Sequence, residues 1–161
     1  MERKHHYKSK TIWTGNSGQG TKSYNSYERT YKIAIPGKVD ITGSSDPAFR
    51  GNKEFHNPEE MLLAAVSSCH MLWYLHLCAD AGITVVAYED EAEATLIEED
   101  NGSGKFSEIN IRPLVTIKES DKAELAHALH EKANSYCFIA NSLNIKIKHF
   151  VQILLTDSSN K

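Results

Sequence analysis

Hydrophobic side chains occupy almost every position from 61 to 79, where two serines and two histidines are the interruptions. Asn57, just before this run, suits an N-cap, Pro58 suits the first helical position, and Glu60 can complete a capping box. Gly82 supplies a left-handed stop. The pattern predicts a central helix over residues 58–81. Because this helix is apolar on nearly every side, we expect protein to surround it.

Strand-like runs separated by turn residues lie on both sides of this helix. Residues 1–57 predict a hairpin, formed by "YKSKTIWT" and "YERTYKIAI", followed by a long irregular loop. Residues 83–119 predict a hairpin of two long strands that turns at "NGSG". Residues 121–141 predict a capped helix with a short continuation, and residues 143–156 predict a final strand.

The order of these elements, β-β-α-β-β-α-β, defines the fold class. Few helices and hairpin-linked strands indicate an α+β fold with an antiparallel sheet, against which the long helix must lie. A chain of 161 residues can bury a core without staples, so we expect a single domain over residues 1–161.

Composition excludes several function classes. The chain is 40% hydrophobic and 24% charged, with a net charge of −3, and it offers no basic stripe for nucleic acid. Its charged N-terminus lacks the apolar core of a signal peptide, and polar residues interrupt the long apolar run. We therefore expect a cytoplasmic protein with neither a nucleic-acid nor a membrane partner. Three cysteines, an odd number, leave thiol chemistry, metal binding or burial.

Cys69 and Cys137 are the candidate reactive thiols. Cys69 lies in the third or fourth helical turn, beyond the reach of the helix dipole, so an activating cation must come from elsewhere. A cysteine with apolar neighbours is more often a core residue, and the same holds for Cys78. Cys137 follows a helix break among small and polar residues, where a thiol can be partly exposed. Two such thiols could reduce a peroxide through a sulfenic acid and a disulfide.

Two other interpretations use the histidines. His127 and His130 lie three positions apart and could bind a metal with a nearby glutamate, but exposed helix histidines are commoner than ligands and no CxxC motif accompanies them. We expect no metal. His70 follows Cys69 directly, yet helical neighbours point about 100° apart, so His70 is a poor general base for a cysteine hydrolase.

Three motifs carry a family resemblance: "NPEEMLLAAVSSCHM", the "AGI" after it, and "CFIANSLN" before the last strand. From about Phe49 to Leu155 the chain resembles the OsmC/Ohr family of thiol-dependent hydroperoxide reductases. The resemblance implies an intertwined homodimer, with a sheet wrapped around central helices. It also implies reduction of organic hydroperoxides and hydrogen peroxide by two cysteines. We expect no cofactor and a dithiol reductant, such as a lipoyl protein.

The resemblance assigns roles by position. Cys69 matches the peroxidatic cysteine, Cys137 the resolving cysteine, and Glu59 the carboxylate that orients an active-site arginine. Arg50, just upstream of the helix, is the expected arginine, with Arg29 as the alternative. A permanently charged, forked donor suits this role because it can stabilise both a thiolate and the alkoxide on the leaving oxygen.

Helix geometry separates two of these residues. Glu59 and Cys69 lie about 15 Å apart along a straight helix and about 80° apart around it. Either the helix bends, or the long Arg50 side chain spans the gap, or Glu59 serves a partner subunit's cysteine. We favour the last, a site at a two-fold interface. This chain also departs from the family by having Phe138 after the second cysteine, where proline is common.

Two functions from different classes remain. The leading hypothesis is a homodimeric, stress-response peroxidase for organic hydroperoxides. The alternative is a non-catalytic protein on the same fold, with buried cysteines and a small molecule held in an apolar cleft. An apolar wall beside Cys69 would favour alkyl hydroperoxides, and Trp73 and Tyr74 are the first candidates for it.

Overall fold

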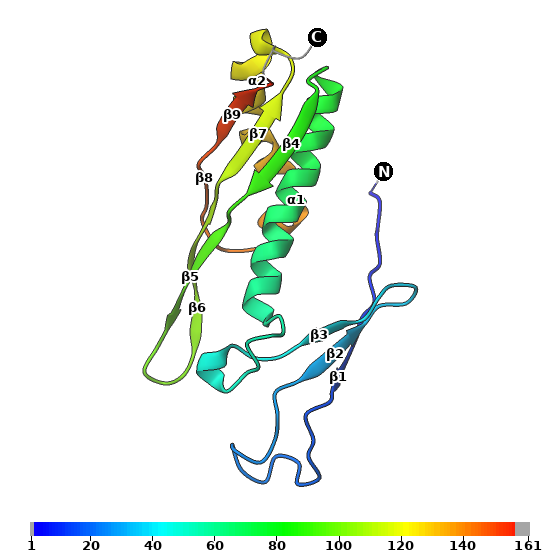
Figure 1. Cartoon of the computed structure of the whole chain (residues 1–161), viewed down its shortest axis with the longest axis vertical. Helices are drawn as coiled ribbons and strands as arrows, with labels where there is room; N and C mark the ends of the chain where they lie inside the picture. Colours follow the sequence, from blue (N-terminus) through cyan, green and yellow to red (C-terminus); the bar gives the residue numbers. More distant parts are fainter. Residues whose placement is uncertain (1, 157–161) are drawn as a thin grey trace. The chain divides into compact units, whose positions relative to one another are not determined.

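A computed structural model describes residues 2–156. The chain divides into two compact units, Met1–Leu62 and Leu63–Lys161, and their elements can be followed in Figure 1. The first unit holds a small sheet and the start of the long helix α1. The second holds the rest of α1 and all later strands and helices. The expected single domain over residues 1–161 therefore stays a prediction.

The first unit is built on three antiparallel strands in the order β1-β2-β3. β1 (Lys10–Trp13) and β2 (Tyr31–Ala34) form the hairpin that the sequence indicates, and β3 (Ile41–Gly43) lies in the stretch expected to be irregular. Three residues are too few to produce an alternating pattern. A Cβ atom on Gly43 would lie 2.4 Å from the ring of Tyr31, its partner across the ladder. A larger residue at this position would displace the Tyr31 ring.

The long helix α1 (Pro58–Asp80) begins as its sequence predicts. The Asn57 side-chain oxygen accepts the Glu60 backbone N–H at 2.8 Å, and the Glu60 carboxylate accepts the Asn57 N–H at 3.2 Å. This reciprocal pair is the capping box. At the other end Gly82 has a φ of 65°, and the Ile83 N–H reaches back to the Cys78 carbonyl at 2.8 Å. Left-handed glycine backbone thus ends the helix.

Burial of α1 within the described chain is confined to one stripe. That stripe comprises Val66, His70, Tyr74, Leu77 and Cys78. Apolar residues elsewhere on the helix stay exposed, as Leu72 does at 63%. By length and composition alone α1 could cross a bilayer, a test that core helices of soluble proteins also pass. We expected protein to surround α1, but within the described residues its own chain covers only this stripe.

The long hairpin of the second unit is present, with each strand divided in two. β5 (Glu93–Glu98) pairs with β6 (Gly104–Ile111) next to the turn, and β4 (Val85–Asp90) pairs with β7 (Pro113–Ile117) beyond it. At the division the Asp90 carboxylate accepts the Arg112 backbone N–H at 2.6 Å and also the Ser67 hydroxyl. This carboxylate replaces a strand partner where the ladder is interrupted.

The C-terminal part differs from a single antiparallel strand. α2 (Ala123–Tyr136) and α3 (Phe138–Asn141) are followed by β8 (Ile147–His149), which pairs parallel to β6, and β9 (Gln152–Leu155), which pairs parallel to β7. A parallel partner requires a crossover connection, and the two helices provide it. The antiparallel prediction is thus right for the hairpins and wrong for the last strand.

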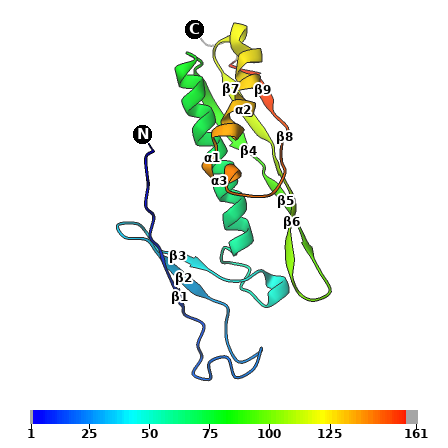
Figure 2. The ribbon, with the colours of Figure 1, turned by 180° about the vertical axis from the view of Figure 1, so that it is seen from behind.

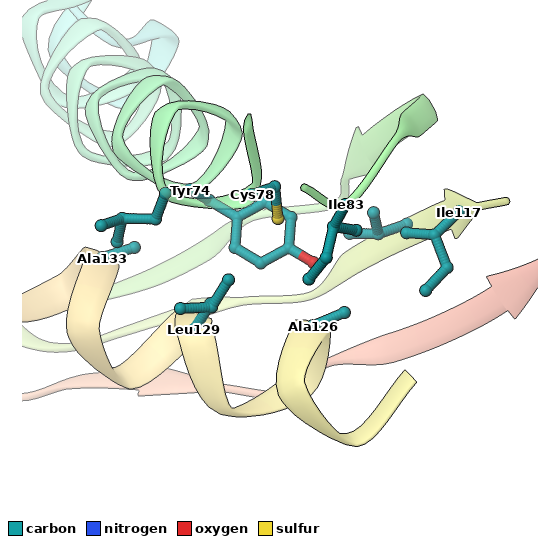
Figure 3. Close-up of a cluster of buried hydrophobic side chains, with 9 residues drawn as sticks. Tyr74, Cys78, Ile83, Ile117, Ala126, Leu129 and Ala133 are labelled. Carbon is teal, nitrogen blue, oxygen red and sulfur yellow. The ribbon is translucent and has the colours of Figure 1, made fainter. Parts of the chain in front are cut away.

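The main core of the second unit lies between its helices and the β4-β7-β9 sheet. Seen from behind, α1 and α2 cover the same face of that sheet (Figure 2). Figure 3 shows Tyr74 and Cys78 of α1 directed toward small and aliphatic side chains, Ala126, Leu129 and Ala133 of α2 together with Ile83 and Ile117. Small residues on α2 let the two helices approach closely, and this packing determines which α1 residues α2 meets.

Candidate functional site

Cys69 and Cys137 lie on different helices of the second unit. Cys69 is partly exposed, at the edge of the buried stripe of α1. Cys137 ends α2 and is the N-cap of α3, where its Sγ accepts the Ala140 backbone N–H at 3.4 Å. Its side chain is 1% exposed, so the expectation of partial exposure is wrong. The capping bond holds this sulfur at the N-terminal end of α3.

The two thiols are neighbours, and the structure has both in the free form. Burial, followed by hydrogen bonding to Cys69, raises the pKa of Cys137 to about 11, although the Ala140 N–H acts in the opposite direction. At neutral pH Cys137 therefore keeps its proton and can donate it toward the Cys69 sulfur.

Cys78, the third thiol, has a structural environment. It is 1% exposed in the main core, and burial raises its pKa. Helix geometry puts it about 13 Å along α1 from Cys69, too far to join the pair. The expectation that a cysteine with apolar neighbours is a core residue holds for Cys78.

An aromatic cluster lies next to the thiol pair. Trp73, one helical turn after Cys69, has its ring centroid 5.2 Å from that of Tyr136 and 5.6 Å from that of Phe138. These last two residues flank Cys137, and they are 44% and 65% exposed. Tyr74, by contrast, is fully buried and stacks on His130 with a centroid distance of 3.7 Å. Of the two aromatic candidates, Trp73 lies near the thiols and Tyr74 belongs to the core.

Both candidate arginines belong to the first unit, and their environments differ. The Arg29 guanidinium donates to the carbonyls of Tyr27 and Tyr24 and lies 4.1 and 4.2 Å from the centroids of those rings. Arg50 follows the short helix η1 (Pro47–Phe49) with a φ of 64° and is exposed. Within residues 2–156 no hydrogen bond or ion pair engages its guanidinium, whose carbon lies 6.0 Å from the Tyr24 ring centroid. Of the two candidates, Arg50 is thus the arginine whose donors are all unengaged among the described residues.

Glu59 lies in the first turn of α1, half-buried in the first unit. Burial, with the negative charge of Glu59 as the second cause, raises the pKa of Tyr31. The helix is continuous from Pro58 to Asp80, so no break in it brings Glu59 back toward Cys69. The fold brings the two cysteines together, whereas the roles of Arg50 and Glu59 stay predictions.

The histidines are arranged differently from the surface pair considered above. His127 is exposed but His130 is 2% exposed, and the Nδ1 atom of His130 lies 2.9 Å from Nε2 of His70. His130 is therefore a core residue, in phase with the apolar positions Ala126 and Ala133 of α2. That phase is the sequence signal for its burial. Across the described residues no three His, Cys, Asp or Glu side chains are grouped as a metal site would need.

Comparison with known proteins identifies the relatives of this arrangement. Residues 51–150 match the family described as OsmC-like protein. The chain belongs to the OsmC-like protein family. The match includes both paired cysteines, and it confirms the resemblance seen in the motifs around them.

Individual relatives of this OsmC-like protein agree with that assignment. An uncharacterized protein of Bacillus subtilis strain 168, YmaD, is 29% identical over 143 residues, covering 86% of this chain and 87% of its own. The structure of an OsmC-like protein of unknown function from Vibrio cholerae has a TM-score of 0.83 at 25% identity, covering 92% of this chain and all of that one. An organic hydroperoxide resistance protein from Elizabethkingia anophelis has a TM-score of 0.69 at 15% identity, with coverage of 96% and 99%. These similarities confirm the α+β fold with a long helix.

Proposed function

We propose that this OsmC-like protein is a thiol-dependent peroxidase that reduces organic hydroperoxides. Membership of the family, and structural neighbours named for hydroperoxide resistance, support a role of this general kind. The observation that carries the specific proposal is the contact between Cys69 and Cys137, two thiols delivered by separate helices. Paired free thiols next to a partly exposed surface are what a sulfenic acid and disulfide cycle requires.

The accessible thiol is the nucleophile. The Cys69 thiolate attacks the terminal oxygen of the hydroperoxide, the O–O bond breaks, and the leaving alkoxide takes a proton to become an alcohol. Cys69 is then a sulfenic acid. Cys137 attacks its sulfur as a thiolate, a disulfide forms, and the sulfenic hydroxyl leaves with a proton as water. A dithiol such as a lipoyl protein restores both thiols.

The raised pKa of Cys137 accounts for the division of roles. A thiol with a pKa of about 11 is almost entirely protonated at neutral pH, so it does not compete with Cys69 for the peroxide. Its Ala140 N–H contact holds the sulfur close to Cys69 until the sulfenic acid forms.

Activation is assigned to Arg50, oriented by Glu59. The guanidinium would stabilise the Cys69 thiolate and the developing alkoxide, and a bidentate pair with the carboxylate would hold it in position. We place the site at the interface of a cytoplasmic homodimer. The apolar surface of α1 that its own chain leaves exposed, including Leu72, is the surface that a second copy would bury.

Substrate preference is assigned to the aromatic cluster. Trp73, Tyr136 and Phe138 present an apolar, partly exposed surface beside the thiol pair. Such a surface favours a hydroperoxide with an alkyl or aryl group over hydrogen peroxide, because only the former gains from apolar contact.

Thiol counting after addition of cumene hydroperoxide tests the proposal. The reduced protein should lose two of its three thiols, and Cys137→Ser should lose one and form a dimedone adduct at Cys69. Cys69→Ser should lose none. The matched control is Cys78→Ala, which keeps Cys69 and Cys137. This variant should lose both of its thiols, as the wild type loses the same two, because Cys78 lies in the core. Steady turnover with dithiothreitol should disappear in Cys69→Ser.

The alternative function makes the opposite prediction. Burial of Cys137 is the observation that favours a non-catalytic binding protein. If the wild type keeps all its thiols in excess cumene hydroperoxide while remaining folded, the peroxidase proposal fails.

A further inference from the structure

A hydrogen-bonded pair of histidines lies inside the second unit. His70 of α1 and His130 of α2 are 1% and 2% exposed, and Nε2 of the first lies 2.9 Å from Nδ1 of the second. The two rings are inclined by only 15°, with centroids 5.2 Å apart. Nearly coplanar rings at this separation place one N–H in line with the lone pair of the other ring, the favoured hydrogen-bond geometry.

This pair is held neutral and in a fixed orientation. Burial is the main cause that lowers the pKa of each imidazole to about 3, so one proton lies between the two facing nitrogens. Tyr74, one turn after His70, stacks on the His130 ring at 3.7 Å. The outer nitrogens, His70 Nδ1 and His130 Nε2, have no hydrogen-bond partner among the described residues. Among the described residues, the bond between the two rings is thus the one hydrogen bond that either imidazole makes.

The histidines lie on the same two helices as the cysteines. His70 is next to Cys69 on α1. Cys137 directly follows the last residue of α2 and lies seven positions after His130, which is about 10 Å along the axis and within about 20° of the same face. The rest of this helix contact is apolar and includes Ala126 and Ala133, so within the described residues it adds no directional polar contact between α1 and α2. A shift of one residue's rise, about 1.5 Å, would separate both pairs.

We infer that the His70–His130 pair is a positioning device that sets the register of α1 against α2 and so holds Cys137 next to Cys69. Neither histidine touches the substrate. The inference rests on the proposed function for its catalytic consequence: condensation of Cys137 with the Cys69 sulfenic acid needs the register, whereas attack of Cys69 on the peroxide does not.

Two substitutions at position 130 separate the hydrogen bond from packing. His130→Leu fills similar space without a polar atom. His130→Asn keeps a polar atom close to the position of Nδ1, where it can pair with His70. Exposed His127 supplies a control on the same helix through His127→Leu, and Leu129→Ala weakens the same helix contact without touching the bond.

The measurement is the rate of each thiol's loss after mixing reduced protein with cumene hydroperoxide. In His130→Leu the rate of the first thiol loss should stay within about threefold of the wild-type rate. The rate of the second thiol loss should fall by about tenfold or more, because misplacing reacting atoms by about 1 Å can lower a rate up to a hundredfold. His130→Asn, His127→Leu and Leu129→Ala should keep the second rate within about threefold. Equal second rates in His130→Leu and the wild type would overturn the inference. If His130→Leu does not fold, a tenfold slower second loss in folded His130→Asn would overturn it instead.

A second oxidant distinguishes failure of this inference from failure of the proposed function. Diamide takes two electrons and two protons from a close pair of thiols, forming a disulfide without any peroxide chemistry. If the wild-type thiols do not react with cumene hydroperoxide but diamide quickly forms a disulfide between Cys69 and Cys137, the peroxidase proposal fails. The variants are then compared by their rates of disulfide formation with diamide. Slower joining in His130→Leu, but not in His130→Asn, supports the positioning role. Equal joining in all variants refutes it.

Discussion

Acid should destabilise this protein through two particular imidazoles. His70 and His130 have their pKa lowered to about 3 by burial, against about 6.5 in an unfolded chain. Between these values the unfolded state binds more protons than the folded state, so stability falls as pH decreases. The contribution is fully present above about pH 6.5 and is lost progressively toward pH 3.

The size of the effect follows from the interval crossed. At pH 4.5, about two pH units below its pKa of about 6.5, an unfolded histidine is protonated, whereas the buried histidine is still neutral. This difference lowers the free energy of unfolding by about 2–3 kcal/mol for each residue. The mutual repulsion that helps to lower the pKa of His130 is absent while His70 is neutral, so the pair together contributes less than twice this amount, about 4 kcal/mol. Two other titratable groups face the pair. One is His149 of β8, whose pKa the charge of Asp90 of β4 acts to raise, and the other is His127 of α2.

Urea unfolding at pH 7 and pH 4.5, at one protein concentration, measures this contribution. The double variant His70→Leu/His130→Leu lacks both groups and keeps every carboxylate, as well as His149 and His127. Titration of those shared groups cancels in the comparison. The wild type should therefore lose about 4 kcal/mol more than the double variant between the two pH values. Equal losses would show that the pair is not held neutral, and the argument from burial would be wrong.

Three further predictions concern single side chains. Asn57→Ala should lower the free energy of unfolding by about 1 kcal/mol in urea titration, because it removes the capping box, and an unchanged midpoint would contradict this. Trp73→Ala should raise KM for cumene hydroperoxide about tenfold, through loss of about 1.5 kcal/mol of apolar contact, and leave hydrogen peroxide within about twofold. Arg50→Lys should slow the first thiol loss by about tenfold or more, while Arg29→Lys should not, since lysine lacks the forked donor. The reverse order would assign the role to Arg29.

Features created by neighbours in sequence follow from the sequence. The Asn57 and Glu60 hydrogen bonds join residues three positions apart, and Gly82 ends α1 through its own backbone freedom. The two halves of the long hairpin meet across the short "NGSG" turn. Such interactions need no information about distant parts of the chain. The family assignment rests likewise on local motifs around Cys69 and Cys137.

Other features required long-range packing. The parallel pairing of β8 and β9 depends on where α2 and α3 return the chain to the sheet. Burial of His130, but not of His127, depends on which face of α2 meets α1. Arg50 and Arg29 look alike in sequence, and only the contacts of the folded first unit show that Arg29 is already engaged.

The sequence by itself determined the identity of the helices and hairpins and the two cysteines worth attention, because periodicity, caps and turns are local properties of the chain. Tertiary structure alone decided that these two thiols meet, that Cys137 is buried at the α2–α3 break, and that a histidine pair joins α1 to α2. The physical reason is that contact between distant residues depends on how two helices pack, and that packing is a property of the whole core.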